Sequence, residues 1–145
     1  MKIASFEKKH VAAVAELERI CFSSPISEKN LETILVGGIG KGFVCLDDTD
    51  KVVAYGGVMI AADEAQILNI ATNPDFRGRG LGKAIVSAIL DCSKTAGAAV
   101  VSLEVRESNL AAIKLYKSFD FYEVGRIKKY YKAPEEDALI MKKEF

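Results

Sequence analysis

Histidine and cysteine are scarce in this sequence, and tryptophan is absent. The 145 residues include one histidine, His10, and three cysteines, Cys21, Cys45 and Cys92. A single histidine leaves little material for a Ser-His-Asp triad or a histidine-rich zinc site, and the cysteines show no metal-ligand spacing. We therefore expect no metal site, and His10 stands in a charged stretch without an obvious partner. An odd number of free thiols is typical of a reducing cytoplasm.

A net charge of one sign and long apolar runs are also lacking. Twenty Lys and Arg balance twenty Asp and Glu, so no global field attracts nucleic acid. No apolar run approaches the roughly 20 residues that span a bilayer, and the N-terminal MKIASFEKKH has no apolar segment typical of a secretory signal. These absences predict a cytoplasmic protein that binds neither membrane nor nucleic acid. The length predicts a single domain over residues 1–145.

Apolar periodicity divides the chain into strands and helices. Strands are predicted at 2–6, 42–46, 52–60, 67–71, 98–105, 121–131 and 138–142, and helices at 8–22, 27–35, 81–95 and 109–119. The apolar run at 98–105 indicates a buried strand parallel to 67–71, because a helix connects the two. Gly56 and Gly57 inside a strand indicate a bulge or a close backbone approach. The order β-α-α-β-β-β-α-β-α-β-β predicts an α/β fold, with a mixed sheet of about seven strands and about four flanking helices.

One stretch, QILNIATNPDFRGRGLG from Gln66 to Gly82, joins a predicted strand to a glycine-rich turn and a helix. Unpaired N–H groups in a first helical turn, together with glycines that let a ligand approach the backbone, make such a junction an anion site. The dinucleotide pattern G-x-G-x-x-G fails, because Lys83 stands where the last glycine is needed. The nucleotide-triphosphate loop fails because Gly78 and Gly82 are one residue too close.

The pattern that fits is [RQ]-x-x-G-x-[GA], filled by Arg77, Gly80 and Gly82. On its own this pattern also describes an ordinary turn with solvated arginines. Longer stretches narrow the choice: DEAQILNIA at 63–71, RGRGLG at 77–82, LEVRESNLAAIKLY at 103–116 and EDALIM at 136–141. With these stretches the chain resembles the GNAT superfamily of acetyltransferases, and more narrowly its bacterial RimI-type subgroup. That subgroup acetylates the N-terminal alanine of a small-subunit ribosomal protein.

The resemblance implies a GNAT fold, acetyl-CoA as cosubstrate and a protein N-terminus as acceptor. Ile70, Ala71 and Thr72 would offer backbone groups to the pantetheine arm and the acetyl carbonyl. Asn109, which is expected to cap a helix, would contact the coenzyme near the thioester. The pyrophosphate would be held by the six residues of the glycine-rich turn, Arg77, Gly78, Arg79, Gly80, Leu81 and Gly82.

Glu104 and Tyr116 are the candidate catalytic residues. A carboxylate at the carboxyl end of a buried strand lies where ligands of α/β sheets bind, so Glu104 suits a general base acting through water; the alternative is a salt bridge to Arg106 or a lysine. Tyr116 would be the general acid, because a phenol with a pKa of roughly 10 can protonate a departing thiolate. Its alternative role is packing in the core. Tyr130 and Tyr131 are implied to border the acceptor groove.

Three functions stay open at this stage. An α-amine is about a tenth neutral at pH 7 and a lysine amine about 0.04%, which favours N-terminal acetylation. Acetylation of a small amine, polyamine or lysine side chain is the second possibility. A coenzyme-A-binding regulatory module without turnover is the third. Ile26 stands where the family often has tryptophan, which bears on acceptor preference.

Overall fold

The computed structural model describes all residues from 1 to 145 and contains seven strands and four α-helices. The strands are β1 (Lys2–Ser5), β2 (Gly40–Leu46), β3 (Val52–Ala61), β4 (Glu64–Thr72), β5 (Val100–Arg106), β6 (Tyr122–Tyr131) and β7 (Glu136–Glu144). The helices are α1 (Val11–Cys21), α2 (Glu28–Leu35), α3 (Leu81–Thr95) and α4 (Leu110–Lys117), with short 3-10 turns η1 (Lys8–His10) and η2 (Pro74–Phe76). The predicted α/β order is confirmed.

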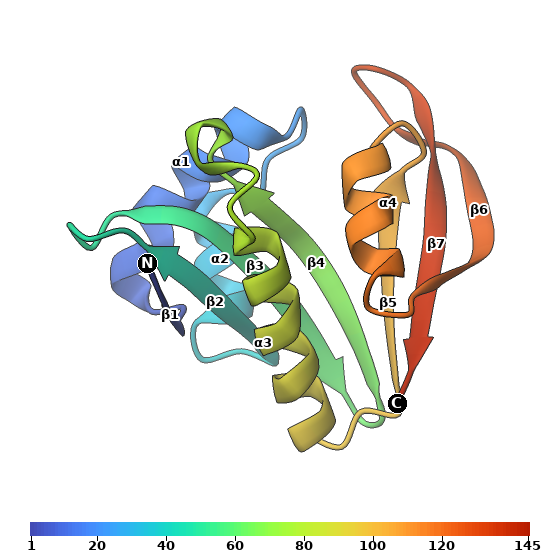
Figure 1. Cartoon of the computed structure of the whole chain (residues 1–145), viewed down its shortest axis with the longest axis horizontal. Coiled ribbons are helices and arrows are strands. Elements are labelled where there is room, and N and C mark those ends of the chain that lie inside the picture. The colour runs from blue at the N-terminus through green and yellow to red at the C-terminus, as the bar shows by residue number, and fades with distance from the viewer.

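The strands form one mixed sheet with helices on both faces. The strand order is β1-β2-β3-β4-β5-β7-β6, and β4–β5 is its parallel pair. In Figure 1, α3 and α4 lie in front of the sheet and α1 and α2 behind it. Alternating side chains of β2 show the two layers: Cys45 belongs to the core under α3, whereas Val44 and Leu46 belong to the core under α1 and α2. The sheet therefore separates two hydrophobic cores.

The pairing of β4 with β5 ends after three residues. Glu64 to Gln66 pair with Val100 to Ser102, and beyond them no β4–β5 pair remains. Figure 1 shows the two strands diverging from this point toward the carboxyl end of each. The sheet is thus split along half of its central parallel pair, and the split leaves one edge of β4 without a partner strand.

Gly56 and the cap of α2 show how the sequence sets these elements. A Cβ on Gly56 would lie 2.3 Å from Ile85 Cγ2 of α3, and the β3–β4 register shifts between Gly56 and Val58. Both predicted features of the Gly56-Gly57 pair, a close approach and a bulge, are therefore present. Ser27 Oγ accepts from the Asn30 N–H at 3.2 Å, which begins α2 as expected.

The one histidine has a structural partner that the sequence does not reveal. The Glu7 N–H donates to His10 Nδ1 at 3.0 Å, and the side chain is buried. Burial lowers the pKa of His10, with a smaller contribution from Lys9. The expectation that His10 lacks a partner is therefore wrong: its ring accepts the hydrogen bond from the residue that precedes η1.

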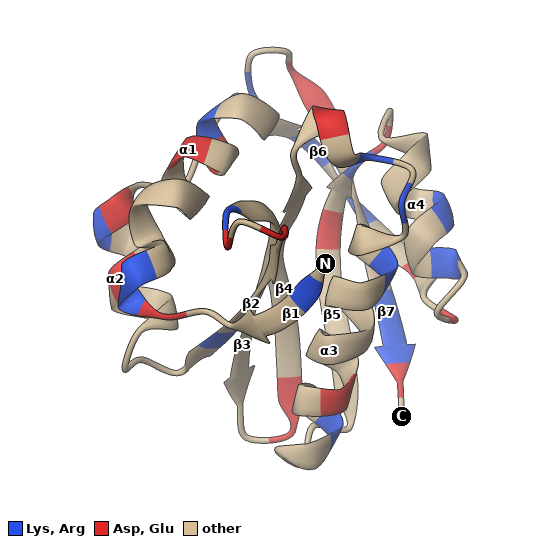
Figure 2. Ribbon diagram, turned by 60° about the vertical axis from the view of Figure 1, so that its left-hand side comes forward, with Lys and Arg blue, Asp and Glu red and all other residues tan.

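The surface carries both signs of charge in close alternation. Figure 2 shows Lys and Arg interspersed with Asp and Glu on α1 and α2. No helix of the protein combines the length and the apolar character that a membrane crossing requires.

Candidate active site

Two adjoining cavities open where β4 and β5 diverge. The loop cavity, about 510 Å³, lies between the glycine-rich turn, the start of α3 and α4. The sheet cavity, about 210 Å³, passes between β4 and β5 to the face that carries α1. Both are lined by Cys21, Phe22, Ile70, Asn109, Ala112 and Tyr116. The two cavities therefore meet, and a ligand in one can touch a ligand in the other.

The loop cavity has the features of an anion site. Gly78 and Gly80 have φ of +77° and +79°, and a Cβ on either would meet no protein atom within 4 Å. The backbone N–H groups of residues 77–80 make no hydrogen bond within the protein. The first N–H groups of α3 also lack partners by helix geometry, and the helix dipole favours an anion there. This open backbone cradle fits a pyrophosphate.

The two arginines of the turn are placed differently. Arg77 lines the loop cavity, and its Nε donates to the Thr72 carbonyl at 3.2 Å. Arg79 does not line either cavity: its guanidinium lies 4.9 Å from the centre of the Phe76 ring and donates to the Asp75 carbonyl at 3.4 Å. Of the residues predicted to hold the coenzyme, Arg79 is thus the one that is not at the cavity wall.

The split edge of β4 and the start of α4 complete this cavity. Ile70, Ala71 and Thr72 line it and lie beyond the last β4–β5 pair, so one edge of the strand is free to bind an extended ligand. Asn109 Oδ1 accepts from the Ala112 N–H at 3.2 Å and so begins α4, as predicted. The cap leaves the Asn109 side-chain NH₂ group available to the cavity.

Glu104 faces the sheet cavity on the α1 side of the sheet. Residues of β5 alternate between buried and half-buried, and Glu104 and Arg106 share the half-buried face. Tyr130 donates its hydroxyl to Glu104 Oε2 at 2.9 Å, and this bond is the main cause of a raised Tyr130 pKa. No salt bridge joins Glu104 to Arg106, which pairs with Glu136 instead.

A strand irregularity aims Tyr130 at Glu104. The β6–β7 register shifts between Ile127 and Tyr131, and Lys129 has a positive φ of 55°. The Lys129 N–H donates to Asp137 Oδ1 at 3.0 Å, so Asp137 stabilises this left-handed residue. Bulges beside active sites commonly redirect a side chain in this way.

Tyr116 reaches the meeting point of the two cavities from the opposite face. Its ring is 7% exposed and lies 5.7 Å from that of Phe121. Its hydroxyl makes no hydrogen bond in the protein, while the ring lines both cavities. Burial raises the Tyr116 pKa well above its usual value, so the phenol stays protonated throughout the physiological range. It is a proton donor without a competing partner.

Glu18 is a residue of this region that the sequence analysis missed. It is fully buried, and no cation pairs with it. Its carboxylate accepts from the Tyr55 hydroxyl, from Asn69 Nδ2 at 3.0 and 3.1 Å, and from the Ile26 N–H at 2.9 Å. The sequence does indicate a buried position for Glu18, because this residue stands four residues after Val14 on the apolar stripe of α1.

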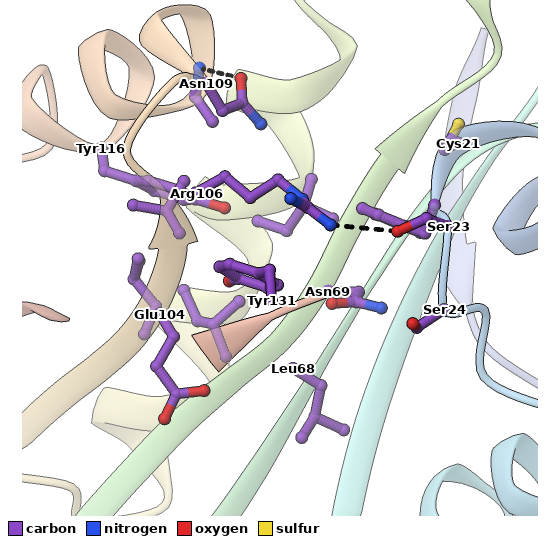
Figure 3. A pocket seen from close by; sticks show the side chains of 16 residues that line it. Cys21, Ser23, Ser24, Leu68, Asn69, Glu104, Arg106, Asn109, Tyr116 and Tyr131 are labelled. Atoms are coloured by element: carbon purple, nitrogen blue, oxygen red, sulfur yellow. Dashed lines mark hydrogen bonds between the residues drawn. The ribbon is translucent and has the colours of Figure 1, made fainter. Parts of the chain in front are cut away.

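Arg106 is the second missed residue. Figure 3 shows its side chain reaching from β5 across the sheet cavity to Ser23, above Tyr131. The Arg106 guanidinium lies 4.5 Å from the Tyr131 ring centre and donates to Ser23 Oγ at 3.0 Å. A lone arginine after a buried strand gave no sequence signal for these contacts.

Comparison with known proteins agrees with this geometry. The model of the acetyltransferase (GNAT) family matches residues 11–121. A Salmonella typhimurium protein named [ribosomal protein bS18]-alanine N-acetyltransferase is 37% identical over 133 residues, covering 89% of this chain and 87% of its own length. The Escherichia coli ribosomal-protein-S18-alanine N-acetyltransferase structure has a TM-score of 0.90 at 33% identity, covering 99% of this chain and 92% of that chain. Arabidopsis thaliana NAA60 in complex with acetyl-CoA shares the fold, with a TM-score of 0.87 at 17% identity, covering 99% of each chain.

An anion loop that opens onto a cavity through the sheet, with a carboxylate on the far side, suits an enzyme that transfers an acyl group. The chain belongs to the GNAT acetyltransferase family, and acetyl-CoA is its acetyl donor. The residues present fit this donor, because the free backbone at Gly78 and Gly80 leaves the space that a pyrophosphate needs.

Proposed function

We propose that this enzyme transfers the acetyl group of acetyl-CoA to the N-terminal α-amine of a protein, with the N-terminal alanine of ribosomal protein bS18 as acceptor. The observation that carries the proposal is the meeting of the loop cavity and the sheet cavity at Tyr116. A donor held at the loop and an amine in the sheet cavity come together there from opposite faces of the sheet. The names of the Salmonella and Escherichia coli relatives supply the acceptor.

The donor is held mainly by main-chain groups in this proposal. Ile70 to Thr72 bind the pantetheine arm and orient the acetyl carbonyl, while the turn from Arg77 to Gly82 binds the pyrophosphate. Asn109 contacts the coenzyme near the thioester through its side-chain NH₂ group. The free N–H groups of residues 77–80 and the unpaired edge of β4 support these assignments. Such fixed dipoles stabilise charge without reorganising during the reaction.

Glu104 acts as the general base, through a water molecule. It lies on the acceptor side of the sheet cavity, and the Tyr130 hydroxyl at 2.9 Å orients its carboxylate. A carboxylate that accepts one hydrogen bond retains lone pairs for a water. The proton of the attacking amine therefore leaves on the α1 side of the sheet.

Tyr116 acts as the general acid. It lies at the junction of the cavities, and its buried phenol is protonated and makes no other hydrogen bond. The thiolate leaves toward the donor side, where this hydroxyl can protonate it. Base and acid thus work from opposite faces, which keeps the two proton transfers from competing for one group.

The proposal is tested with the natural acceptor. Small-subunit ribosomal proteins that lack N-terminal acetylation are incubated with the enzyme and acetyl-CoA, and the modified site is located by mass spectrometry. We expect one acetyl group on the bS18 α-amine and none with the Tyr116→Phe variant over the same time. Acetylation of lysine side chains or polyamines, with the bS18 N-terminus unchanged, would replace the proposed acceptor.

A further inference from the structure

Asn69 of β4 is turned onto the α1 face of the sheet by a bulge. The β3–β4 register shifts between Gly56 and Val58, so that Leu68 and Asn69 both lie opposite one residue of β3. As a result both side chains face α1: Leu68 packs against the core under α1 and α2, and Asn69 reaches Glu18 of α1. In a strand without a bulge, successive side chains point to opposite faces. The bulge therefore brings a polar side chain to the wall of the sheet cavity.

The carboxylate of Glu18 fixes the direction in which the Asn69 amide points. Asn69 Nδ2 lies 3.1 Å from Oε1 and 3.0 Å from Oε2 of this buried carboxylate. The other donors to Glu18 are the Tyr55 hydroxyl and the Ile26 N–H of the α1–α2 loop, residues 22–27. If the Asn69 amide were turned over, its oxygen would lie against the carboxylate with no proton between them. The amide therefore keeps one orientation.

The oxygen of the same amide is left facing the sheet cavity. Asn69 Oδ1 has no hydrogen-bond partner in the protein, and it is open to solvent, since no buried side-chain oxygen lacks a partner. Asn69 lines the sheet cavity and not the loop cavity. In Figure 3 its oxygen lies on the side of Tyr131 and Glu104, and its nitrogen on the side of Ser24. The cavity thus has a fixed hydrogen-bond acceptor on β4, across the split from the Glu104 carboxylate on β5.

We propose that Asn69 binds the acceptor amine, whose N–H donates a hydrogen bond to Asn69 Oδ1. In the proposed function, on which this role rests, the amine enters between β4 and β5. A protonated amine has three N–H donors and a neutral primary amine has two, so either form needs several acceptors as it leaves water. Glu104 and Asn69 supply acceptors from opposite strands. Because the amide oxygen of asparagine does not take up a proton at neutral pH, Asn69 orients the amine while Glu104 remains the base.

The test measures how much the amine itself contributes to binding. A peptide that begins with alanine and its propionyl counterpart differ only in the replacement of the α-amine by hydrogen. Both are titrated near pH 7, by calorimetry, into enzyme saturated with CoA, so that no acetyl group is present and no turnover occurs. The ratio of the two dissociation constants, propionyl over alanyl, isolates the amine. Since both peptides bind the same protein, a general loss of packing cancels from this ratio.

Asn69→Ala should lower the ratio about tenfold, the order expected when one hydrogen bond to a charged group is lost. The KM of the alanine peptide should rise by a similar factor, and the acetyl-CoA dissociation constant should not change. Because asparagine does not titrate, the pH–rate profile should stay parallel to that of the wild type, unlike the profile of Glu104→Gln. Asn30→Ala is the matched control: Asn30 is exposed on α2 and lines neither cavity, so the ratio should keep its wild-type value.

An unchanged ratio in Asn69→Ala would overturn the proposal, because the side chain would then contribute nothing specific to the amine. A second measurement uses the wild-type protein and so does not depend on the folding of the variant. A crystal structure with CoA and the alanine peptide should place the amine nitrogen about 2.7 to 3.5 Å from Asn69 Oδ1. A longer separation, or a water molecule between the two atoms, would also overturn the proposal.

The proposed function fails separately, when the wild-type enzyme and acetyl-CoA leave the alanine peptide unmodified. The amine contact is then measured with a lysine peptide whose N-terminus is blocked and with its norleucine counterpart, in which hydrogen replaces the ε-amine. Asn69→Ala should lower the ratio of these two dissociation constants as well. An unchanged ratio for this pair would overturn the role of Asn69, whichever amine the enzyme acetylates.

Discussion

The two cavities of this enzyme are built in different ways. Eight of the 16 residues that line the loop cavity come from two stretches, 70–72 and 77–82, that are close in the sequence and offer main-chain groups. The sheet cavity is formed by side chains from α1, β4, β5 and β6, which lie far apart in the chain. In the proposed function, the donor site thus depends more on local backbone conformation, and the acceptor site on tertiary contacts between distant residues.

This difference predicts how each cavity responds to mutation. Main-chain N–H groups are unaffected by most side-chain substitutions, so the binding of acetyl-CoA should depend mainly on the conformation of the glycines. The acceptor side should be sensitive to single polar side chains that do not touch the donor. A substitution can therefore affect one cavity and not the other. Substitutions of the reacting groups at the junction of the cavities should lower the rate most.

Tyr116→Phe should lower the single-turnover rate by about 10² to 10⁴-fold, because the acid for the leaving thiolate is lost. The acetyl-CoA dissociation constant should hardly change. Since the Tyr116 hydroxyl makes no hydrogen bond in the protein, the melting temperature should also be nearly unchanged. Acetylation of an alanine-initiated peptide, measured beside thermal unfolding, checks this expectation.

The control for this variant is Tyr122→Phe. Tyr122 is exposed and donates its hydroxyl to Glu144, away from both cavities. Its loss should leave the rate at the wild-type value. A Tyr116→Phe rate within threefold of wild type would show that the ring only packs against Phe121.

Glu104→Gln should lower kcat by about 10²-fold near neutral pH and less at alkaline pH, because an amine that is already neutral no longer needs the base. The Tyr130 hydroxyl can still donate to the glutamine oxygen, so the site should keep its shape. The pH–rate profile should therefore rise more steeply than that of the wild type. Glu123→Gln on β6 is the control. A profile parallel to the wild type would remove Glu104 from the role of base.

The pKa of the buried Tyr116 sets a second expectation for the pH–rate profile. Burial raises the folded-state pKa of Tyr116 above its unfolded value of roughly 10, so the phenol loses its proton only at still higher pH. No decrease in rate from this group should occur below about pH 10. A rate that falls between pH 8 and 9 would contradict Tyr116 as the acid.

The fold and the anion loop could be predicted from the sequence because their signals are local. Apolar periods and turn residues defined each element, and the strand, glycine-rich turn and helix lie in one continuous stretch. The Gly56-Gly57 bulge was also visible as a local backbone requirement. A resemblance over long motifs then suggested Glu104 and Tyr116, although periodicity alone would assign Tyr116 to the core.

The contacts of the proposed acceptor side could not be predicted, because they join residues far apart in the chain. Glu18 meets Asn69 across 51 residues, and Arg106 meets Ser23 across 83. The bulge that turns Tyr130 toward Glu104 depends on Asp137 in the next strand, not on a glycine in β6. The spacing of residues within one helix or strand does not reveal such pairs.

Gly80→Ala should weaken acetyl-CoA binding roughly tenfold, because a Cβ fills the cradle and the left-handed conformation becomes strained. Gly97→Ala is the matched control: Gly97 also has a positive φ, of 92°, but follows the far end of α3. Both variants should lose about 1 to 2 kcal/mol of stability. Calorimetry should find weaker binding for Gly80→Ala alone. Equal affinities would show that the turn does not hold the pyrophosphate.

Glu18→Gln should have the smallest effect on activity and should act on the acceptor alone. Glutamine keeps the shape of the side chain, and its oxygen can still accept from the Ile26 N–H. Its NH₂ group, however, replaces the oxygen that accepts from Asn69 Nδ2 and from the Tyr55 hydroxyl, so the Asn69 bond is lost and the Tyr55 hydroxyl must turn to accept, at a cost of about 1 kcal/mol. The α1–α2 loop should then be held less firmly, raising the KM of the peptide acceptor about threefold with an unchanged acetyl-CoA dissociation constant.

Hydrogen exchange at the Ile26 amide separates this positioning role from a general loss of packing. Its N–H should exchange faster in Glu18→Gln, while amides of α3 should keep their wild-type rates relative to global unfolding. Glu16→Gln is the control on the same helix, because Glu16 is exposed and pairs only with Arg19, where an ion pair contributes little. If Glu18→Gln loses stability and the acceptor KM does not change, the buried network supports the core and not the acceptor site. If acetyl-CoA binding weakens in parallel with the KM, the two cavities are not independent, and the separation of donor and acceptor sites fails.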